Sequence, residues 1–392
     1  MLRISRRTDG MNILTLNYEF PPIGGGAAPM TLELCRQFVR LGHRTDVVTM
    51  RFRGLPAYEE TEGVRVFRTP CIRRRPDLCH IHEMASYLIG AYPALARLFQ
   101  ETRYDVVHTH FIIPTGPLGL RVRRKAGCPW VVTVHGSDVP GYNPDRFRLA
   151  HRLLFPYWRR LVQQADGVVS PSGYLRALLK RHCPPLDVRV IPNGIESGLF
   201  APDAPKQPQI LACSRLLPRK GIQYLIAAVR DVPLGWPVHI VGDGPYLPTL
   251  RAMAEGSKTP IHFYGWLDRS DPRFKELYES SAVFVFPSEA ENFPTVLLEA
   301  MAAGCAVITT DAGGCSEAAG EAAVYVKPRD VEGLRMQLLA LIANPHLREQ
   351  WSQKARARAA DFSWPGIARM YLELFESLLR KDSAGGSRQE RR

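Results

Sequence analysis

Short apolar runs alternate with longer amphipathic stretches along most of this chain of 392 residues. The short runs predict β-strands at 12–17, 45–50, 64–67, 105–109, 130–134, 167–170 and 188–191, and again at 209–213, 238–241, 261–264, 282–286, 306–309 and 323–326. The stretches between them have helical spacing, for example at 27–41, 82–102 and 174–181. Alternating strands and helices predict an α/β protein with parallel sheets covered by helices on both faces.

The length suggests two domains of ordinary size. A turn-rich segment at 191–195 and the prolines of 202–208 mark a boundary between them. We therefore expect one Rossmann-like domain at 11–200 and a second at 201–363. A last helix at 364–381 follows, and the ends at 1–10 and 382–392 are predicted to be disordered.

One loop and helix in the second half combine an anion-binding site with two carboxylates. Pro294 suits the first position of a helix, and the amides of Thr295 and Val296 then point out of the helix start, where an anion binds well. Glu291 lies in the preceding loop, and the side chain of Glu299 tilts back along the helix toward the same end. A nucleoside diphosphate sugar, with its charged diphosphate between two polyols, requires this combination.

Two further loops could contact phosphate. Arg215 and Lys220 follow the first strand of the second domain, and both can converge on one anion, although an isolated pair of this kind is often only solvated. Gly24, Gly25 and Gly26 follow the first strand of the chain and could present backbone amides to a phosphate. A plain strand–helix turn would also explain these glycines, because they do not match the dinucleotide fingerprint.

Histidines follow two of the predicted strands. His135 comes directly after a buried strand, and Asp138 in the same loop is better suited to orienting the loop than to chemistry. His108 and His110 have a spacing that metal ligands also use, but no third ligand is evident, so we predict no metal site. The chain also has no Asp-x-Asp pair of the kind that clamps a metal and a diphosphate.

Together these motifs resemble family 4 of the retaining glycosyltransferases, which have the GT-B fold. The resemblance rests on the E-x7-E spacing of Glu291 and Glu299, with the Pro-Ser before it and the Glu-Ala-Met-x-x-Gly after it. It also rests on Arg215 followed five positions later by Lys220-Gly, and on the Pro-Pro-x-x-Gly-Gly and His-Gly-x-Asp elements. Asn292 and Pro294 depart from the family, which often has glycine at both positions. The resemblance implies two Rossmann-like domains facing across a cleft, with a last helix that crosses back to the first domain.

The resemblance also implies a reaction, in which a sugar moves from a UDP- or GDP-linked donor to an acceptor hydroxyl with retention of anomeric configuration. The expected setting is bacterial-type polysaccharide or glycolipid synthesis, without a metal or other cofactor. Glu299 is expected to bind the ribose, Glu291 the sugar hydroxyls, and His135 the sugar near its anomeric centre. The diphosphate is expected to contact Arg215, Lys220, Thr295, Val296 and Gly24–Gly26. The base is expected near Gly242–Gly244 and near the segment 263–267, which includes Phe263, Tyr264, Gly265 and Leu267, and the acceptor side is expected to include Asp138 and Asn193.

The net charge of +13 lies almost entirely in residues 1–200. Within this half, residues 146–160 interleave arginines with large apolar side chains, a pattern that fits either an anionic membrane surface or a helix packed into the domain. We therefore expect a cytoplasmic protein that could be peripheral on the inner face of the membrane, with a sugar or lipid-linked acceptor. No apolar run approaches membrane-spanning length, no C-x-x-C occurs among the eight cysteines, and no nucleic-acid-binding motif is present.

Two other functions remain open at this point. A GT-B-fold epimerase of nucleotide sugars would use the same phosphate contacts but would need no acceptor. A non-catalytic sugar-binding or scaffold protein is expected to have lost one of four residues, and this chain keeps Arg215, Lys220, Glu291 and Glu299. An assay with the donor alone distinguishes the first alternative from transfer.

Overall fold

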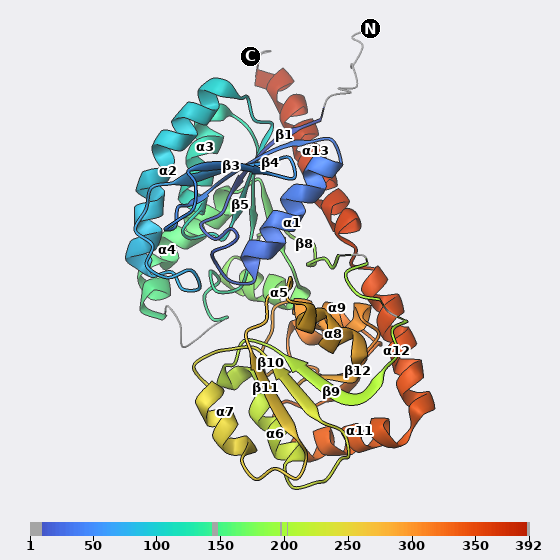
Figure 1. Ribbon diagram of the computed structural model, residues 1–392. Coiled ribbons are helices and arrows are strands. Elements are labelled where there is room, and N and C mark those ends of the chain that lie inside the picture. The colour runs from blue at the N-terminus through green and yellow to red at the C-terminus, as the bar shows by residue number, and fades with distance from the viewer. Residues whose placement is uncertain (1–9, 143–147, 197, 202, 390–392) are drawn as a thin grey trace. The chain divides into compact units, whose positions relative to one another are not determined.

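The computed structural model describes residues 10–142, 148–196, 198–201 and 203–389 (Figure 1). The chain divides into two compact units, each built around its own sheet. The first unit comprises the described residues up to Pro192 together with those from Trp364 onwards, and the second comprises Asn193–Ser363. The chain therefore leaves the first unit and returns to it with its last helix.

The first unit has an eight-stranded sheet in the order β3-β4-β2-β1-β5-β6-β7-β8. The strands are β1 (Asn12–Leu16), β2 (Arg44–Met50), β3 (Tyr58–Thr61), β4 (Val64–Thr69), β5 (Val106–His110), β6 (Trp130–Thr133), β7 (Gly167–Ser170) and β8 (Val188–Val190). The helices are α1 (Ala27–Arg40), α2 (Ile81–Glu101), α3 (Gly116–Ala126), α4 (Arg148–Gln164), α5 (Gly173–His182) and α13 (Trp364–Gln389). Every neighbouring pair is parallel except β3 and β4.

Alternation along the strands directs apolar side chains to both faces of this sheet. Ile13 and Val106 belong to a core with α1 and α13. Leu14 and Val107 belong to the opposite core, which α2, α3, α4 and α5 cover. The last helix is therefore an integral layer of the first unit, as Figure 1 shows for its red ribbon beside α1.

The second unit has a six-stranded parallel sheet in the order β11-β10-β9-β12-β13-β14. The strands are β9 (Gln207–Cys213), β10 (Val238–Val241), β11 (Ile261–Gly265), β12 (Ser281–Phe286), β13 (Ala306–Thr310) and β14 (Val324–Val326). The helices are η1 (Pro218–Lys220), α6 (Ile222–Val229), α7 (Leu247–Ala254), α8 (Pro272–Ser280), α9 (Thr295–Ala302), α10 (Gly314–Ala319), α11 (Val331–Ala343) and α12 (Pro345–Ala360). Separate apolar cores lie on the two faces of this sheet.

The predicted strands are confirmed to within two residues at nearly every end, but the short β3 was missed. Its sequence Tyr-Glu-Glu-Thr carries no apolar alternation, because β3 lies at the sheet edge and is mostly exposed. The unit boundary lies at Pro192 and Asn193 rather than after 200, because Ile195 and Phe200 are buried in the core of the second unit.

The last helix also differs from its predicted length. It runs to Gln389, past the expected end at 381, since no proline interrupts the segment and each further residue adds a backbone hydrogen bond. The predicted extension at 1–10 lies outside the described residues except for Gly10, and so do residues 390–392.

Candidate active site

The loop that carries Arg215 and Lys220 connects β9 to α6 and is held by its backbone. Gly242 has a φ of +134°, and a Cβ there would lie 1.8 Å from the carbonyl oxygen of Ser214. The Leu216 amide also donates to the carbonyl of Asp243 at 2.9 Å. Gly242 and its neighbours therefore support the Arg215 loop, and the base contact that the sequence suggests for them stays a prediction.

Lys220 and Glu291 form an ion pair, although they are separated by 71 positions in the sequence. The Ser288 hydroxyl donates to the same carboxylate oxygen of Glu291 at 2.7 Å. The Glu291 and Ser288 side chains are buried, and that of Lys220 is largely so. Two residues with predicted roles toward phosphate and sugar are thus already joined in one polar cluster.

The Glu291 loop is also fixed from α10. The Gly314 amide donates to the Glu291 carbonyl at 2.9 Å. A Cβ on Gly314 would lie 1.5 Å from the carbonyl oxygen of Asn292, so any side chain there would displace the loop. This backbone contact positions the Glu291 carboxylate beside Lys220.

Glu299 lies on α9 and uses both of its carboxylate oxygens. Arg269 forms an ion pair with one oxygen, and the Tyr278 hydroxyl donates to the other at 3.1 Å. The Glu299 carboxylate raises the pKa of the Arg269 guanidinium above its usual value. Because a carboxylate can accept about four hydrogen bonds, Glu299 keeps capacity for further donors.

Two features leave positive charge available for a ligand. The guanidinium of Arg215 is exposed and forms no hydrogen bond or ion pair with any residue that the structure describes. The backbone amides of Thr295 and Val296 likewise lack a partner in the described part of the chain, whereas that of Leu297 bonds to Pro294. Helix α9 begins at Thr295, so Pro294 is the residue before the helix and not its predicted first residue.

In the first unit, His135 and Asp138 lie in one loop after β6. Asp138 accepts from the His135 amide at 2.9 Å and from the Ile112 amide at 2.8 Å, so it ties this loop to the segment after β5. Burial raises the pKa of the Asp138 carboxyl to about 6. The predicted role of orienting the loop agrees with these contacts.

The His135 ring is itself held by a second histidine. Its Nε2 lies 3.1 Å from Nδ1 of His110. Burial lowers the pKa of His135 to about 3, which keeps the ring neutral. His110 thus contacts the predicted site residue His135, and its spacing with His108 did not indicate this contact. Among the described residues, no group of three or more His, Cys, Asp or Glu side chains is arranged to hold a metal ion.

The glycine loop of the first unit is partly occupied by the chain itself. The Gly25 amide donates to the Glu19 carboxylate at 2.9 Å, and the Gly24 amide donates to the Pro76 carbonyl at 2.8 Å. Gly26 precedes α1, and a Cβ there would meet no neighbour. A phosphate contact by the Gly25 amide would therefore require the Glu19 carboxylate to move away.

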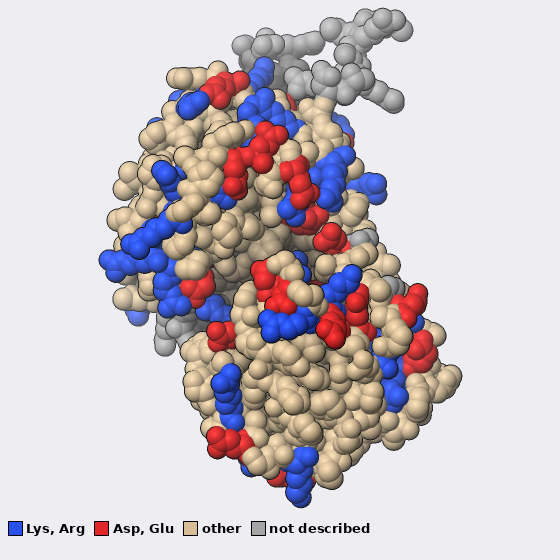
Figure 2. Space-filling view, viewed as in Figure 1, with Lys and Arg blue, Asp and Glu red and all other residues tan. Residues whose placement is uncertain are grey.

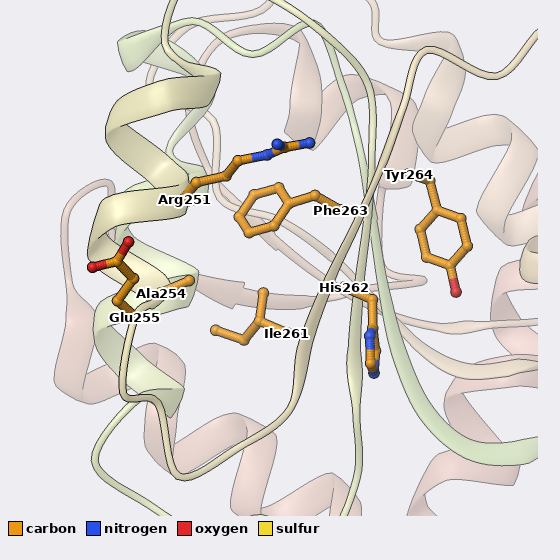
Figure 3. A pocket seen from close by; sticks show the side chains of 7 residues that line it. All are labelled: Arg251, Ala254, Glu255, Ile261, His262, Phe263 and Tyr264. Atoms are coloured by element: carbon orange, nitrogen blue, oxygen red, sulfur yellow. The ribbon is translucent and has the colours of Figure 1, made fainter.

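A hollow of about 620 Å³ lies beside the edge strand β11, between this strand and α7 (Figure 3). Phe263 points toward α7, where the Arg251 guanidinium lies 6.0 Å from the centre of its ring, and Tyr264 points the other way. Two of its seven lining residues, Phe263 and Tyr264, belong to the segment near which the base is expected, and none is expected to contact the diphosphate or the sugar. Gly265 ends β11, and Leu267 is buried in the core after it.

Several site residues carried no signal in the sequence. Arg269 and Tyr278 lie in a loop and a helix without a recognisable motif, and only the fold brings them to Glu299.

Asn193, which the sequence analysis assigns to the acceptor side, belongs to the second unit, where its side-chain amide donates to the Phe293 carbonyl at 3.1 Å. Ser288 was visible only as part of the Pro-Ser element.

Two family models match the chain. The model described as Glycosyltransferase Family 4 matches residues 24–198, and the model described as Glycosyl transferases group 1 matches residues 200–358. Each match falls almost entirely within one of the two units. Together they span most of the described chain.

Individual proteins match over nearly the same length. The GDP-mannose-dependent alpha-(1-6)-phosphatidylinositol monomannoside mannosyltransferase of Mycolicibacterium smegmatis is 27% identical, over 85% of this chain and 90% of its own. The structure of sucrose-phosphate synthase from Thermosynechococcus elongatus matches with a TM-score of 0.81 at 22% identity, covering 95% of this chain and 100% of that one. Anabaena HepE in complex with UDP-glucose matches with a TM-score of 0.70 at 19% identity, covering 94% and 100%.

Proposed function

This chain belongs to family 4 of the glycosyltransferases and has their GT-B fold, and we propose that it transfers a sugar from a nucleoside diphosphate donor with retention of anomeric configuration. The cluster of Lys220, Glu291 and Ser288 carries the proposal. It combines a cation for a phosphate with a carboxylate for sugar hydroxyls. In the absence of donor, the Lys220–Glu291 ion pair stabilises both charges.

Donor binding assigns a task to each part of the second unit. The diphosphate binds to the guanidinium of Arg215, to the ammonium of Lys220 and to the backbone amides of Thr295 and Val296. Glu291 then accepts from sugar hydroxyls. Glu299, held in place by Arg269 and Tyr278, accepts from the ribose hydroxyls. The base is assigned to the segment of Gly265 and Leu267, on the side of the sheet where β11 ends.

The transfer step breaks the bond between the anomeric carbon and the diphosphate oxygen and forms a bond from that carbon to the acceptor oxygen. The acceptor proton passes to the departing diphosphate on the same face of the sugar, which retains the configuration. Arg215 and Lys220 stabilise the charge that develops on the leaving group, without a metal ion. Glu291 and Glu299 are engaged by cations, which favours a step that needs no carboxylate nucleophile. His135 and Asp138, on the first unit, are assigned to the sugar and acceptor side.

A thermal-shift screen with UDP, GDP and their sugar conjugates, each with and without EDTA, tests the donor site. Named donors among similar proteins are GDP-mannose and UDP-glucose, so these two lead the screen. We expect one nucleotide class to stabilise the protein by about 2.7 kcal/mol at 100 times its Kd, with no effect of EDTA. Arg215→Ala should abolish the shift.

Two results would contradict this part of the proposal. The absence of any shift from a folded sample would remove the donor site and favour a scaffold. Conversion of the donor sugar without an acceptor would favour an epimerase.

An anionic membrane surface is the acceptor environment that we propose, with a lipid-linked acceptor. Helix α4 packs Trp158 and Leu161 into the core, yet it also exposes Leu149, Leu153 and Tyr157 at four-residue intervals. The two interpretations of this basic, aromatic stretch are therefore compatible. Figure 2 shows Lys and Arg residues gathered along the edge of the first unit that α2 and α4 form.

Exposed apolar side chains of α2 extend the same surface. Ile89 is 73% exposed, and the Arg121 guanidinium lies 4.7 Å from the centre of the Tyr92 ring. Apolar side chains interspersed with arginines suit the boundary between headgroups and acyl chains. No helix in the described part of the chain is long and apolar enough to cross a membrane.

Vesicle co-sedimentation checks this surface. We expect binding to phosphatidylcholine vesicles that contain phosphatidylglycerol and little binding to phosphatidylcholine alone, because the arginines supply much of the attraction. Leu153→Glu should weaken the binding by roughly tenfold, from the loss of a buried leucine. Leu339→Glu, at an exposed leucine of the second unit, is the matched control. Equal binding to both vesicle types would count against the proposal.

A further inference from the structure

Three histidines from neighbouring strands form a continuous row in the first unit. His108 and His110 are on β5, paired in register with β6, and His135 follows β6. The ring centres of His108 and His110 are 4.4 Å apart, and those of His110 and His135 are 5.3 Å apart with near-parallel planes. His108 and His110 are fully buried, whereas His135 is partly exposed. The row thus runs from the core to the loop that carries the predicted sugar-contacting residue.

The hydrogen bonds in the row restrict where its protons lie. A neutral imidazole has one donor and one acceptor nitrogen. Nε2 of His110 is buried and has no partner among the described residues, while Nδ1 lies 3.1 Å from Nε2 of His135. A buried N–H without an acceptor is less favourable than a bare lone pair in the same place. His110 therefore carries its proton on Nδ1 and donates a hydrogen bond from this N–H to Nε2 of His135.

The hydrogen bond from His110 determines the tautomer of His135. Since its Nε2 accepts this bond, a neutral His135 has its proton on Nδ1. Burial lowers the pKa of His108, His110 and His135, so all three rings stay neutral at physiological pH. His135 then presents an Nδ1–H donor, which can bond to an oxygen of the sugar or of the diphosphate, and it does not act as a base there.

A residue with a strained backbone also contacts the His135 ring. Phe111 has a φ of +71°, a backbone conformation that bulky residues rarely adopt. Its ring lies 4.5 Å from that of His135 and 5.0 Å from that of Tyr18. Thr115 donates to the carbonyl oxygens of both His110 and Phe111, which fixes this turn. Strain of this kind persists where the surroundings enforce it, and it often marks a functional site.

We propose that His110 is a positioning residue, which orients the His135 ring and fixes it in the tautomer with the proton on Nδ1. His110 itself touches no substrate in this scheme. The inference rests on the proposed function for its effect on transfer, but the tautomer can be observed without any turnover.

The experiment compares His110→Asn with His110→Leu in the full-length chain. An asparagine amide can place an N–H near the position of Nδ1, whereas leucine fills the space and donates nothing. The tautomer is measured by two-bond proton–nitrogen NMR of protein labelled with ¹⁵N-histidine, with His135→Gln used to assign the signal. The transfer rate is measured in parallel, separated into kcat and KM.

We expect His135 to be neutral with its proton on Nδ1 in the unaltered protein and in His110→Asn, and to change tautomer in His110→Leu. The value of kcat should fall by roughly 10- to 100-fold in His110→Leu with KM little changed, and should recover in His110→Asn. A proton on Nε2 of His135 in the unaltered protein would overturn the inference, and so would equal losses in the two variants. The tautomer of His135 in the unaltered protein tests the inference even if His110→Leu does not fold. If no transfer is detected with any donor while the tautomer is as expected, the proposed function fails and the positioning role stands.

Discussion

Replacement of Lys220 by alanine is expected to lower kcat/KM for transfer by roughly 100- to 1000-fold, as the loss of a group that stabilises developing charge does in other enzymes. The same change should destabilise the second unit by about 3 kcal/mol, because it leaves the buried Glu291 carboxylate without its cation. Both effects follow from one ion pair.

Arg215→Ala separates the two effects. Arg215 is exposed and unpaired with any described residue, so its loss should reduce activity by a similar factor and leave the melting temperature almost unchanged. The double variant Lys220→Ala with Glu291→Gln should regain most of the stability, since neither charge remains, and yet stay inactive. Steady-state kinetics and urea unfolding of the same preparations measure both quantities.

Lys327→Ala is a suitable control for these variants. Lys327 pairs with Asp311 at the surface of the same unit, so its replacement removes a cation without touching the cluster. Full activity in Lys220→Ala would contradict the assignment of Lys220 to the leaving group. A double variant no more stable than Lys220→Ala would contradict the argument from the unpaired carboxylate.

The strands and the order of domains could be predicted from the sequence because buried parallel strands are short, apolar and separated by helices. β3 could not, since an exposed edge strand needs no apolar face. The predicted domain boundary after residue 200 lies further along the chain than the observed division at Pro192 and Asn193, for a related reason. Proline and polar residues after 200 suggest a linker, but the burial of Ile195 and Phe200 is a tertiary property that no local pattern displays.

The candidate site divides in the same way. Glu291 and Lys220 could be found because each lies in a motif directly after a strand, whereas their ion pair depends on how two loops meet. Arg269 pairs with Glu299 from a loop without any motif, so no sequence pattern would have indicated it. The sequence shows His110 only as one of two histidines at a spacing that metal ligands also use, without a third ligand, and the contact of His110 with His135 appears only in the structure.

The first unit is expected to lose stability in mild acid because of its buried histidines. Burial lowers the pKa of His108 and His135 to about 3, whereas the same residues titrate near 6.5 in the unfolded chain. The unfolded state therefore binds more protons below pH 6.5. Stability is fully present above that pH and falls as the pH decreases toward 3, by about 2 kcal/mol at pH 5 for each of these two histidines.

The Asp138 carboxyl has the opposite effect on the pH dependence of stability, because its pKa is raised rather than lowered. Its pKa is raised to about 6 in the folded state, so its contribution to stability increases as the pH falls below 6. The lowered pKa values of His108, His110 and His135 together outweigh the single raised pKa of Asp138. The free energy of unfolding should therefore still decrease between pH 6.5 and pH 5.

Urea unfolding from pH 7.5 to 5 measures this slope, in a protein whose tryptophans at 236, 266 and 351 are replaced by phenylalanine so that the signal comes from the first unit. His108→Asn should reduce the pH dependence by about 2 kcal/mol at pH 5 even if it lowers stability overall, because it removes one titrating group. The exposed His82→Asn should leave the slope unchanged. A slope that is the same in all three proteins would show that the buried histidines are not the source of the acid sensitivity.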